Sequence, residues 1–279
     1  MEYVEVPDGK IAYTKRGTEG PVVILIHGWS GSHRYFDLNI EALSEKCQVY
    51  ALDLRFHGDS IKKGPHQLAQ LCGDLRDFIS KLNLSDVTLV GTSMGASVIW
   101  AYIDTFKGDK ISKAIFVDQA PLQNKTEDWS LGSKGCYDME TLTNLQTALR
   151  TDLGAAADDT LAACLTLPLS GELCAILKAE TLKCNPDDLG ELMANHTQND
   201  WRHVMASINV PCLNVIGGTS QIFPLEGCKF VGDSIKDCAN VVFEAANHWL
   251  YLEMPDEFNS LVLDFVARGN DGRPKNSVV

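Results

Sequence analysis

The sequence predicts an α/β fold with a mostly parallel central sheet, helices on both faces of the sheet and a helical cap insertion. Three observations lead to this prediction. Short β-branched runs alternate with longer segments of helical period along most of the 279 residues. Residues 122–207 interrupt this alternation because they contain no strand-like run. A serine flanked by glycines lies where one strand-like run passes into a helical segment.

Seven short apolar runs are the predicted strands. They cover residues 11–13, 22–26, 49–52, 87–90, 114–117, 213–216 and 241–243. The predicted helices between them cover residues 36–44, 65–82, 94–106, 225–231 and 255–267. The last helix shows its buried face directly, because Phe258, Leu261, Val262 and Phe265 recur at helical spacing.

The break in the alternation predicts how the chain is divided. We expect residues 1–121 and 208–267 to form the core and residues 122–207 to form a helical cap, or lid. Within the insertion, Leu142, Leu145 and Leu149 follow one another at three- and four-residue spacing, which indicates helix. Residues 268–279 are rich in glycine, asparagine and charge, so we predict a flexible C-terminal tail.

The charge balance restricts the possible partners. The chain has 24 Lys and Arg against 37 Asp and Glu, a formal net charge of −13. A nucleic acid or an anionic membrane surface would need clustered basic side chains, which this acidic chain lacks. No apolar run approaches the ~20 residues of a membrane-spanning helix. We therefore expect no nucleic acid and no membrane, but a small neutral or cationic molecule. The sequence does not indicate an oligomeric state.

The cysteines and the first residues predict the cellular compartment. Nine cysteines, an odd number, lie at least 10 residues apart and form no CxxC motif for metal or redox chemistry. The acidic start Met1-Glu2-Tyr3-Val4-Glu5 does not resemble a secretory signal. We predict reduced, mostly buried thiols and a cytoplasmic location. No metal or other cofactor is predicted, since there is no dinucleotide fingerprint or phosphate-binding lysine loop.

Ser93 is the candidate nucleophile. It lies in Gly91-Thr92-Ser93-Met94-Gly95, between a predicted strand and a predicted helix. A serine at such a turn is held in a strained conformation above the sheet, and the small glycines prevent clashes with neighbouring elements. The following helix N-terminus adds amide donors and partial positive charge where an oxyanion would form. A glycine-rich turn that only packs closely is the structural alternative.

A second glycine loop follows the predicted strand 22–26. Such a loop can direct a backbone N–H at the same oxygen as the turn after Ser93. We assign the two oxyanion donors to the amides of Trp29 and Met94. His27, at the start of the loop, is interpreted as a structural ring that anchors the loop and not as a base.

These segments together resemble the α/β-hydrolase superfamily, in its serine esterase and lactonase or haloperoxidase-like branches. The resemblance covers about residues 10–267. It depends on His27-Gly28-Trp29, the segment 53–60, Gly91-Thr92-Ser93-Met94-Gly95 and Asn247-His248. It implies the α/β-hydrolase fold and a catalytic histidine after the last strand of the core. It also implies structural roles for Asp53, Arg55 and His57.

The resemblance places the catalytic base at His248, which follows the predicted strand 241–243 and precedes the last helix. The acid departs from the commonest pattern of the superfamily. Many members carry an Asp in a Gly-x-x-Asp-x-x-x-Pro segment, where this chain has Ser220. The best substitute is Asp118, at the end of the strand 114–117, since the imidazolium needs a carboxylate on its far side. Glu226 is the second candidate, and bracing of the loop is the structural alternative for Asp118.

These residues predict a serine hydrolase that cleaves a small or medium carboxylic ester or lactone through an acyl-enzyme intermediate. The alternatives are a lyase, a cyclase or a perhydrolase that uses the same site, and a ligand receptor on the same fold. Trp129, Trp201 and His196 are the candidates for substrate binding. For the tryptophans, packing in the core of the cap is equally consistent with the pattern, and for His196 a solvated helix face is the favoured alternative.

Overall fold

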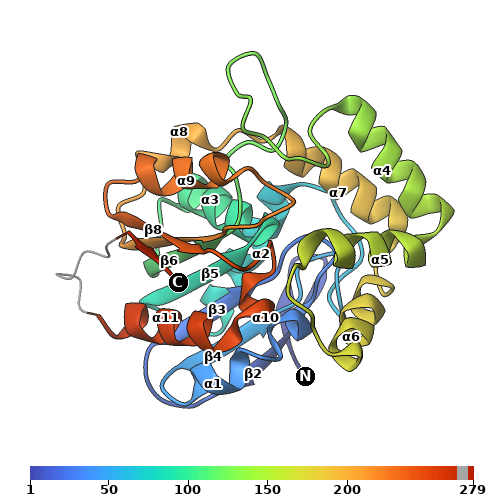
Figure 1. The fold of residues 1–279 in the computed structure, drawn as a ribbon. Helices are drawn as coiled ribbons and strands as arrows, with labels where there is room; N and C mark the ends of the chain where they lie inside the picture. Colours follow the sequence, from blue (N-terminus) through green and yellow to red (C-terminus); the bar gives the residue numbers. More distant parts are fainter. Residues whose placement is uncertain (269–275) are drawn as a thin grey trace.

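The computed structural model describes residues 1–268 and 276–279, which contain a nine-stranded sheet (Figure 1). Its strand order is β1-β2-β4-β3-β5-β6-β7-β8-β9. β1 and β2 form an antiparallel hairpin, β2 pairs antiparallel with β4, and the other pairs are parallel. The strands are β1 (Glu2–Val6), β2 (Gly9–Arg16), β3 (Val22–Ile26), β4 (Gln48–Leu52), β5 (Val87–Thr92), β6 (Ile111–Val117), β7 (Cys212–Gly217), β8 (Cys238–Phe243) and β9 (Ser277–Val278). The predicted fold class is confirmed.

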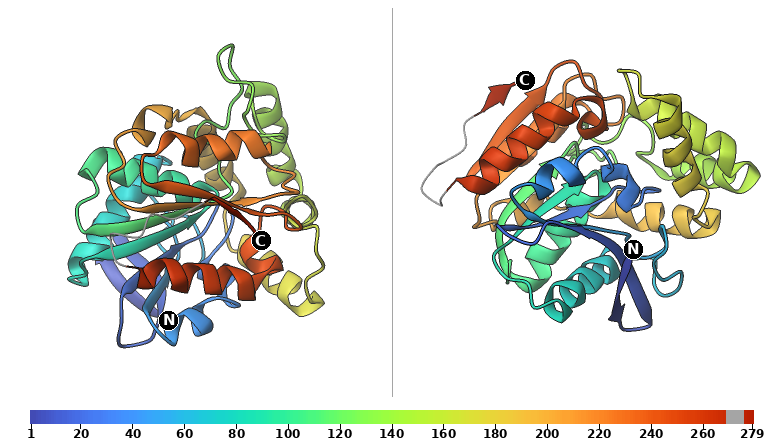
Figure 2. Two further views of the ribbon diagram at one scale, coloured as in Figure 1. Left: turned by 60° about the vertical axis from the view of Figure 1, so that its left-hand side comes forward. Right: turned by 90° about the horizontal axis from the view of Figure 1, so that it is seen from below.

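Helices cover both faces of the sheet because successive side chains of a strand point to opposite faces. In β3, Ile24 and Ile26 belong to one apolar cluster, which includes residues of α2 (Leu68–Lys81), α3 (Met94–Phe106) and α9 (Leu225–Ser234). Their neighbours Val23 and Leu25 belong to a second cluster on the other face. That cluster includes α1 (Ile40–Ser44), α10 (Leu250–Glu253) and α11 (Pro255–Ala267). Figure 2 shows α9 and α11 on opposite sides of the sheet.

The segment 122–207 lies between β6 and β7 and contains five helices in the described structure. They are α4 (Met139–Thr151), α5 (Leu153–Cys164), α6 (Gly171–Thr181), α7 (Pro186–Gln198) and the short α8 (Arg202–Met205). In Figure 1, α4 to α7 gather on one side of the core. Side chains accept hydrogen bonds from first-turn amides at the starts of all four longer helices. These N-cap residues are Asp138, Asp152, Ser170 and Asn185.

The last residues of the chain form strand β9, so the prediction of a flexible tail over residues 268–279 is wrong for residues 276–279. Ser277 and Val278 pair with Val241 and Val242 of β8. The Val279 amide donates to Val242 O, and Val279 O accepts from the Glu244 amide. The edge of β8 offers free donors and acceptors, and the chain end satisfies them. Residues 269–275 of the predicted tail lie outside the described residues.

Among residues 1–268 and 276–279, no helix is both long and apolar enough to cross a lipid bilayer. The longest helix bordering the sheet, α2, illustrates this, since its outer face carries Asp, Arg and Lys side chains.

Candidate active site

Ser93 stands at the turn between β5 and α3, as the residue that precedes the first helical position. Its backbone has φ +52° and ψ −124°, in the region that side chains rarely adopt. The Ser93 amide donates to Val117 O of the neighbouring strand at 2.8 Å. The strain at this residue is therefore sustained by the sheet, and the turn presents the hydroxyl at the wall of a cavity.

The two glycines of the motif are required by close packing. A Cβ at Gly91 would lie 2.4 Å from Gly95 O, and a Cβ at Gly95 would lie 2.3 Å from Ile26 O. Both distances are far below van der Waals contact with backbone atoms that cannot move freely. The helix α3 can start this close to β5 and β3 only where side chains are absent.

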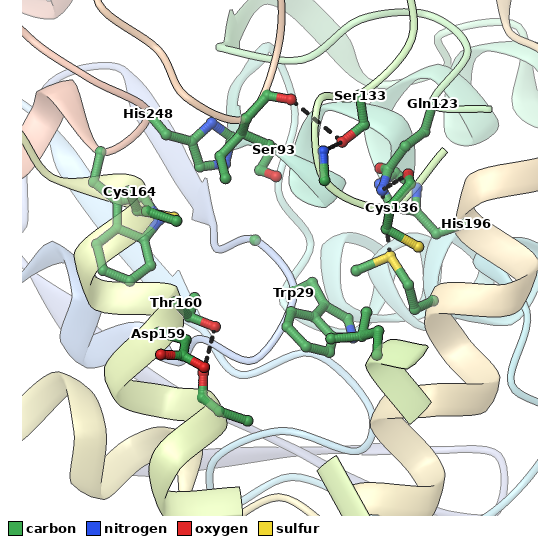
Figure 3. A pocket seen from close by; sticks show the side chains of 18 of the residues that line it. Trp29, Ser93, Gln123, Ser133, Cys136, Asp159, Thr160, Cys164, His196 and His248 are labelled. Atoms are coloured by element: carbon green, nitrogen blue, oxygen red, sulfur yellow. Dashed lines mark hydrogen bonds between the residues drawn. The ribbon is translucent and has the colours of Figure 1, made fainter. Parts of the chain in front are cut away.

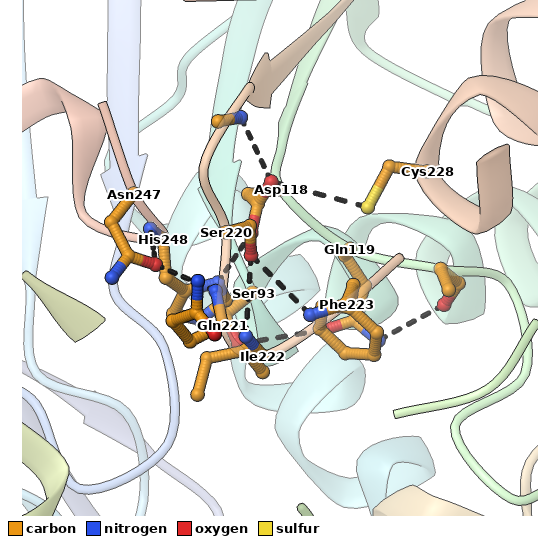
Figure 4. A network of polar contacts seen from close by, with 12 residues as sticks. Ser93, Asp118, Gln119, Ser220, Gln221, Ile222, Phe223, Cys228, Asn247 and His248 are labelled. Carbon is orange, nitrogen blue, oxygen red and sulfur yellow. Dashed lines mark hydrogen bonds and ion pairs between the residues drawn. The ribbon is translucent and has the colours of Figure 1, made fainter. Parts of the chain in front are cut away.

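Asp118 follows β6 directly and is completely buried (Figure 4). Its Oδ1 accepts from the Gly217 amide at 2.9 Å. Its Oδ2 accepts from Ser220 Oγ at 2.7 Å and lies 2.6 Å from His248 Nδ1. The backbone of Asp118 has φ +47°, a second strained position beside the first. Buried charge is tolerated only with such hydrogen bonds, so the carboxylate is fixed in orientation.

Ser220 occupies the position at which the commoner acid of the superfamily was expected, and it supports Asp118. Its hydroxyl donates to the same carboxylate oxygen that contacts His248. The second candidate for the acid, Glu226, lies on the exposed first turn of α9 and pairs with Lys229 at 3.3 Å. Of the two predicted candidates, the structure brings Asp118 to the imidazole.

His248 is held from the backbone side by Asn247, which the sequence analysis named as part of the resemblance but to which it gave no role. Asn247 Oδ1 accepts from the His248 amide at 2.7 Å and from the Gln221 amide at 2.8 Å. The Asn247 amide donates to Glu253 Oε2 at 2.5 Å. This side chain therefore ties the loop of the imidazole to the loop of Ser220, next to the buried carboxylate.

Ser93 and His248 line the same cavity (Figure 3). Within the described residues, Ser93 Oγ donates to Gln119 Oε1 at 3.5 Å, and no hydrogen bond joins it to His248. Gln119 is buried and its amide nitrogen is committed to Ala120 O at 2.9 Å. A 3.5 Å contact is weak, so rotation about χ1 of Ser93 turns the hydroxyl at little cost. Free enzymes often hold such pairs loosely.

The glycine loop after β3 lies close to the serine. A Cβ at Gly28 would lie 3.0 Å from Ser93 Cβ. The Trp29 amide has no acceptor among the described residues, and the Met94 amide belongs to the first turn of α3, where amides lack intrahelical partners. The Trp29 indole donates to Leu189 O of α7 at 2.9 Å, which joins this loop to the insertion.

Three side chains of the resembling segments form a buried support beneath the loop. His27 Nε2 accepts from the Leu54 amide, and His57 Nε2 accepts from the Ser30 amide. Burial lowers the pKa of His27 to about 4 and that of His57 well below its ordinary value. Asp53 accepts from the amide and the ring of His33 and from the Asp59 amide.

Arg55 belongs to the same segment and is also buried. It pairs with Asp74 of α2 through two hydrogen bonds of 2.7 Å each. A Cβ at Gly58, whose φ is +47°, would overlap the Asp53 carboxylate, so the segment can turn here only with glycine. All four polar side chains of the support are used internally, which agrees with the structural roles expected for His27, Asp53, Arg55 and His57.

The cavity above Ser93 has a volume of about 260 Å³ and is mostly apolar. Residues of the core and of the insertion share its lining. The lining residues are Gly28, Trp29, Ser93, Gln123, Ser133, Gly135, Cys136, Leu145, Ala148, Ala156, Asp159, Thr160, Ala163, Cys164, Met193, His196, Ile222, His248 and Trp249. None of these described lining residues is a lysine or arginine, and Asp159 is the one acidic residue among them.

The structure places one of the three substrate-binding candidates, His196, in the lining of this cavity. The other two have to be corrected. Trp129 is buried against Phe230, and its indole donates to Leu122 O at 2.9 Å. Trp201 packs into the core cluster on the α3 face of the sheet. Apolar periodicity marks both kinds of buried tryptophan, so the sequence could not separate packing from cavity lining.

Three other residues that shape the site were missed: Asn247, Gln119 and Glu253. Asn247 and Gln119 are adjacent in sequence to His248 and Asp118, which was the one available signal. Glu253 accepts from the Thr166 and Leu167 amides of the insertion as well as from the Asn247 amide. Such a contact joins three separate stretches of chain and leaves no local pattern.

A family model described as alpha/beta hydrolase fold matches residues 21–255. The chain belongs to this family. Among solved structures, this α/β hydrolase is similar to a bromoperoxidase from Bacillus anthracis, with a TM-score of 0.87, 26% identity, and coverage of 93% of this chain and 96% of that one. It is also similar to an enol-lactonase from Burkholderia xenovorans LB400, with a TM-score of 0.82, 20% identity, and coverage of 96% and 100%.

Among characterised sequences, the α/β hydrolase is similar to a pimeloyl-[acyl-carrier protein] methyl ester esterase of Neisseria meningitidis. The two are 26% identical over 249 residues, which cover 88% of this chain and 93% of the relative. The similarity to the enol-lactonase, at 20% identity, shows a shared fold. The similarities to the bromoperoxidase and to the esterase, at 26% identity, extend over almost the whole chain.

Proposed function

We propose that this protein is a serine hydrolase that cleaves a small or medium carboxylic ester or lactone. The observation that carries the proposal is the 2.6 Å contact between His248 Nδ1 and the buried Asp118 carboxylate, at the wall of the cavity that Ser93 also lines. A carboxylate on Nδ1 fixes the tautomer in which Nε2 is free to accept a proton. The general activity, ester hydrolysis, is supported by relatives named as esterases.

In the first half of the proposed reaction, Ser93 Oγ attacks the carbonyl carbon of the ester while its proton moves to His248 Nε2. The resulting oxyanion is held by the amides of Trp29 and Met94. His248 then gives its proton to the alkoxide oxygen, and the alcohol leaves. Removing one oxyanion donor of this kind costs about 10²–10³ in turnover, and proton transfer contributes about 10²–10⁴.

Water completes the cycle by the same proton path. It gives a proton to His248 Nε2 as its oxygen attacks the acyl carbon, and that proton returns to Ser93 Oγ when the carboxylic acid is released. Asp118 stays ionised throughout and stabilises the imidazolium. With a lactone, the alcohol formed in the first half remains part of the same molecule as the acid.

A fluorophosphonate probe tests the reactivity of Ser93, because it adds only to an activated serine. We expect one covalent adduct per chain, mapped by mass spectrometry to the peptide of Ser93, and loss of hydrolysis of p-nitrophenyl esters. Ser93→Ala should abolish both. Ser260→Ala, on the exposed side of α11, is the matched control and should leave both unchanged. Labelling that persists in Ser93→Ala, or wild-type protein that stays unmodified, contradicts the mechanism.

The cellular setting is part of the same proposal. We infer a cytoplasmic enzyme that acts on a small molecule. The nine cysteines are free, and seven of them are buried, which suits a reducing compartment. The cavity of about 260 Å³ supports a small-molecule substrate, and the net charge of −13 disfavours nucleic acid and anionic membranes.

A further inference from the structure

His196 is a buried polar side chain without a partner in the wall of the cavity. Its residue is 3% exposed, and no hydrogen bond reaches its Nδ1 among the described residues. It lies on α7 in the insertion and contributes to the lining (Figure 3). Buried polar side chains are nearly always hydrogen-bonded, so a ring without a described partner in the wall of a cavity has hydrogen-bonding capacity to offer a ligand.

Gln123 gives His196 a neighbour of the same kind. It is 6% exposed and lines the cavity as well. Its Nε2 donates to Cys136 O at 3.2 Å and contacts Met193 Sδ at 3.5 Å, which fixes the amide plane. These bonds leave Oε1 without a described donor. Figure 3 shows Gln123, Cys136 and His196 close together on the same side of the cavity.

The surroundings of this polar pair determine what it can bind. Trp29, Leu145 and Met193 supply an apolar lining, and no lysine or arginine is present among the described lining residues. Burial lowers the pKa of His196 to about 4, so the ring is neutral near pH 7. A neutral imidazole has one donor and one acceptor nitrogen, and an amide oxygen accepts. The pair therefore matches an uncharged group and not a carboxylate.

We propose that His196 and Gln123 recognise an uncharged oxygen of the substrate, remote from the scissile carbonyl, such as a hydroxyl, keto or ether oxygen. The inference rests on the proposed function and deepens it, because it narrows the substrate to an ester or lactone that carries a second oxygen function. A hydroxyl fits best, since it can donate and accept at once.

Matched p-nitrophenyl esters test the preference. The series consists of p-nitrophenyl hexanoate, its 4-oxo, 5-oxo and 6-hydroxy derivatives, and the mono-p-nitrophenyl ester of adipic acid as the anionic member. We expect kcat/KM for the best oxygenated ester to exceed that for hexanoate by about tenfold, and the anionic ester to be the poorest. In His196→Phe the oxygenated-to-plain ratio should fall to near one. His203→Phe, on the exposed surface of α8, should keep the wild-type ratio.

A ratio in His196→Phe equal to that of the wild type overturns the inference, and so does the absence of any preference in the wild type. Stability separates recognition from a structural role. Because the ring has no hydrogen-bond partner among the described residues, His196→Phe should not lower the melting temperature. Loss of a histidine that braced the cap would lower it. If phenylalanine prevents folding, His196→Leu provides the same test with less volume.

A binding measurement separates this inference from the proposed function. In Ser93→Ala, ethyl 5-hydroxyhexanoate should raise the melting temperature more than ethyl hexanoate does, and the difference should vanish in Ser93→Ala/His196→Phe. Selective binding without hydrolysis by the wild type would reject the proposed function and keep the inference. Hydrolysis with no selectivity that depends on His196 would do the reverse.

Discussion

At the scale of single residues, the most informative position is Ser220. Its hydroxyl donates at 2.7 Å to the oxygen of Asp118 that also faces His248. A hydrogen bond to a buried charge is worth about 1.5–3 kcal/mol. Ser220 thus orients the carboxylate from the place where many members of the superfamily carry the carboxylate itself.

A graded series at the two positions tests the role of the carboxylate. Asp118→Asn should reduce kcat by about 10⁴, because an amide cannot stabilise the imidazolium. Ser220→Ala should reduce kcat by about tenfold, since it frees one carboxylate oxygen. Asp118→Asn/Ser220→Asp should recover at least tenfold over Asp118→Asn, because the new carboxylate lies beside the same imidazole. Steady-state kinetics with one ester decide the order, and equal rates for Asp118→Asn and wild type would remove Asp118 from the mechanism.

At the scale of elements, the short helix α10 connects the insertion to the imidazole loop. The Glu253 carboxylate at its end accepts from the Thr166 and Leu167 amides at 2.5 and 2.6 Å, and from the Asn247 amide at 2.5 Å. One side chain therefore holds together residues 166–167 of the insertion and Asn247 of the imidazole loop, which are about 80 residues apart in the sequence.

Removal of this carboxylate should loosen both segments. We expect Glu253→Ala to lower the free energy of unfolding by about 2–4 kcal/mol and to reduce kcat more than it raises KM, because His248 loses its support. Glu253→Gln keeps an acceptor oxygen and should lie between Ala and wild type. Glu257→Ala, on the exposed face of α11, is the control. Urea unfolding and kinetics on the same samples provide the measurement. If Glu253→Ala changes neither the free energy of unfolding nor kcat, the contact contributes to neither stability nor catalysis.

At the scale of the whole molecule, buried histidines couple stability to pH. His27 and His196 have pKa values lowered to about 4 by burial, against about 6.5 in an unfolded chain. Between these pH values the two histidines bind protons in the unfolded state but not in the folded state. Their contribution to the free energy of unfolding is therefore complete above pH 6.5 and decreases as the pH falls below that value. The pKa of the Asp53 carboxyl is held below its ordinary range by His33, which adds a further loss below about pH 4.

The expected loss is about 2 kcal/mol for each of the two histidines between pH 7.5 and pH 5. Urea unfolding at a series of pH values measures it. His196→Phe should reduce the slope of stability against pH by about one histidine, whereas His203→Phe should not. A stability that stays constant from pH 7.5 to pH 5 would contradict the neutral, buried state of both rings.

The end of the chain also acts at this scale. Deletion of residues 276–279 removes the ladder between β9 and β8, together with the bond from the Asn240 amide to Asn276 Oδ1. These bonds are exposed, so we expect a loss of about 1–2 kcal/mol, or a few degrees of melting temperature. Calorimetry of the deleted chain measures it. Asn276→Ala should account for a small part, and an unchanged melting temperature would favour the flexible tail expected from composition.

The core elements were predictable because their signals are local. The bounds of β3, α3 and α11 match the predicted ranges, since each is an apolar run or stripe between turn residues. Strand β9 was not predictable, because two residues form a strand only where β8 offers an edge. Asp118 was predicted from the resemblance and from the need of an imidazolium for a carboxylate. The contact with His248 forms because the carboxyl ends of the parallel strands β6 and β8, with β7 between them, lie at the same edge of the sheet.

The cavity was less predictable than the fold. Trp129, Trp201 and His196 look alike in a sequence as large side chains in a helical segment, and the structure separates them by which neighbour each one meets. Asn247 and Glu253 act through hydrogen bonds between residues that are 6 to 87 positions apart in the sequence. A periodic pattern within one element does not reveal such contacts. Sequence periodicity thus indicates which side of an element is buried. It does not indicate whether protein or a ligand fills the space beside that side.

The hydrogen bond from the Trp29 indole to Leu189 O joins the glycine loop after β3 to helix α7 of the insertion. The residue whose amide is proposed to hold the oxyanion also fastens α7 over the serine. A change that frees α7 from this contact would therefore also loosen the loop that carries the proposed oxyanion donor.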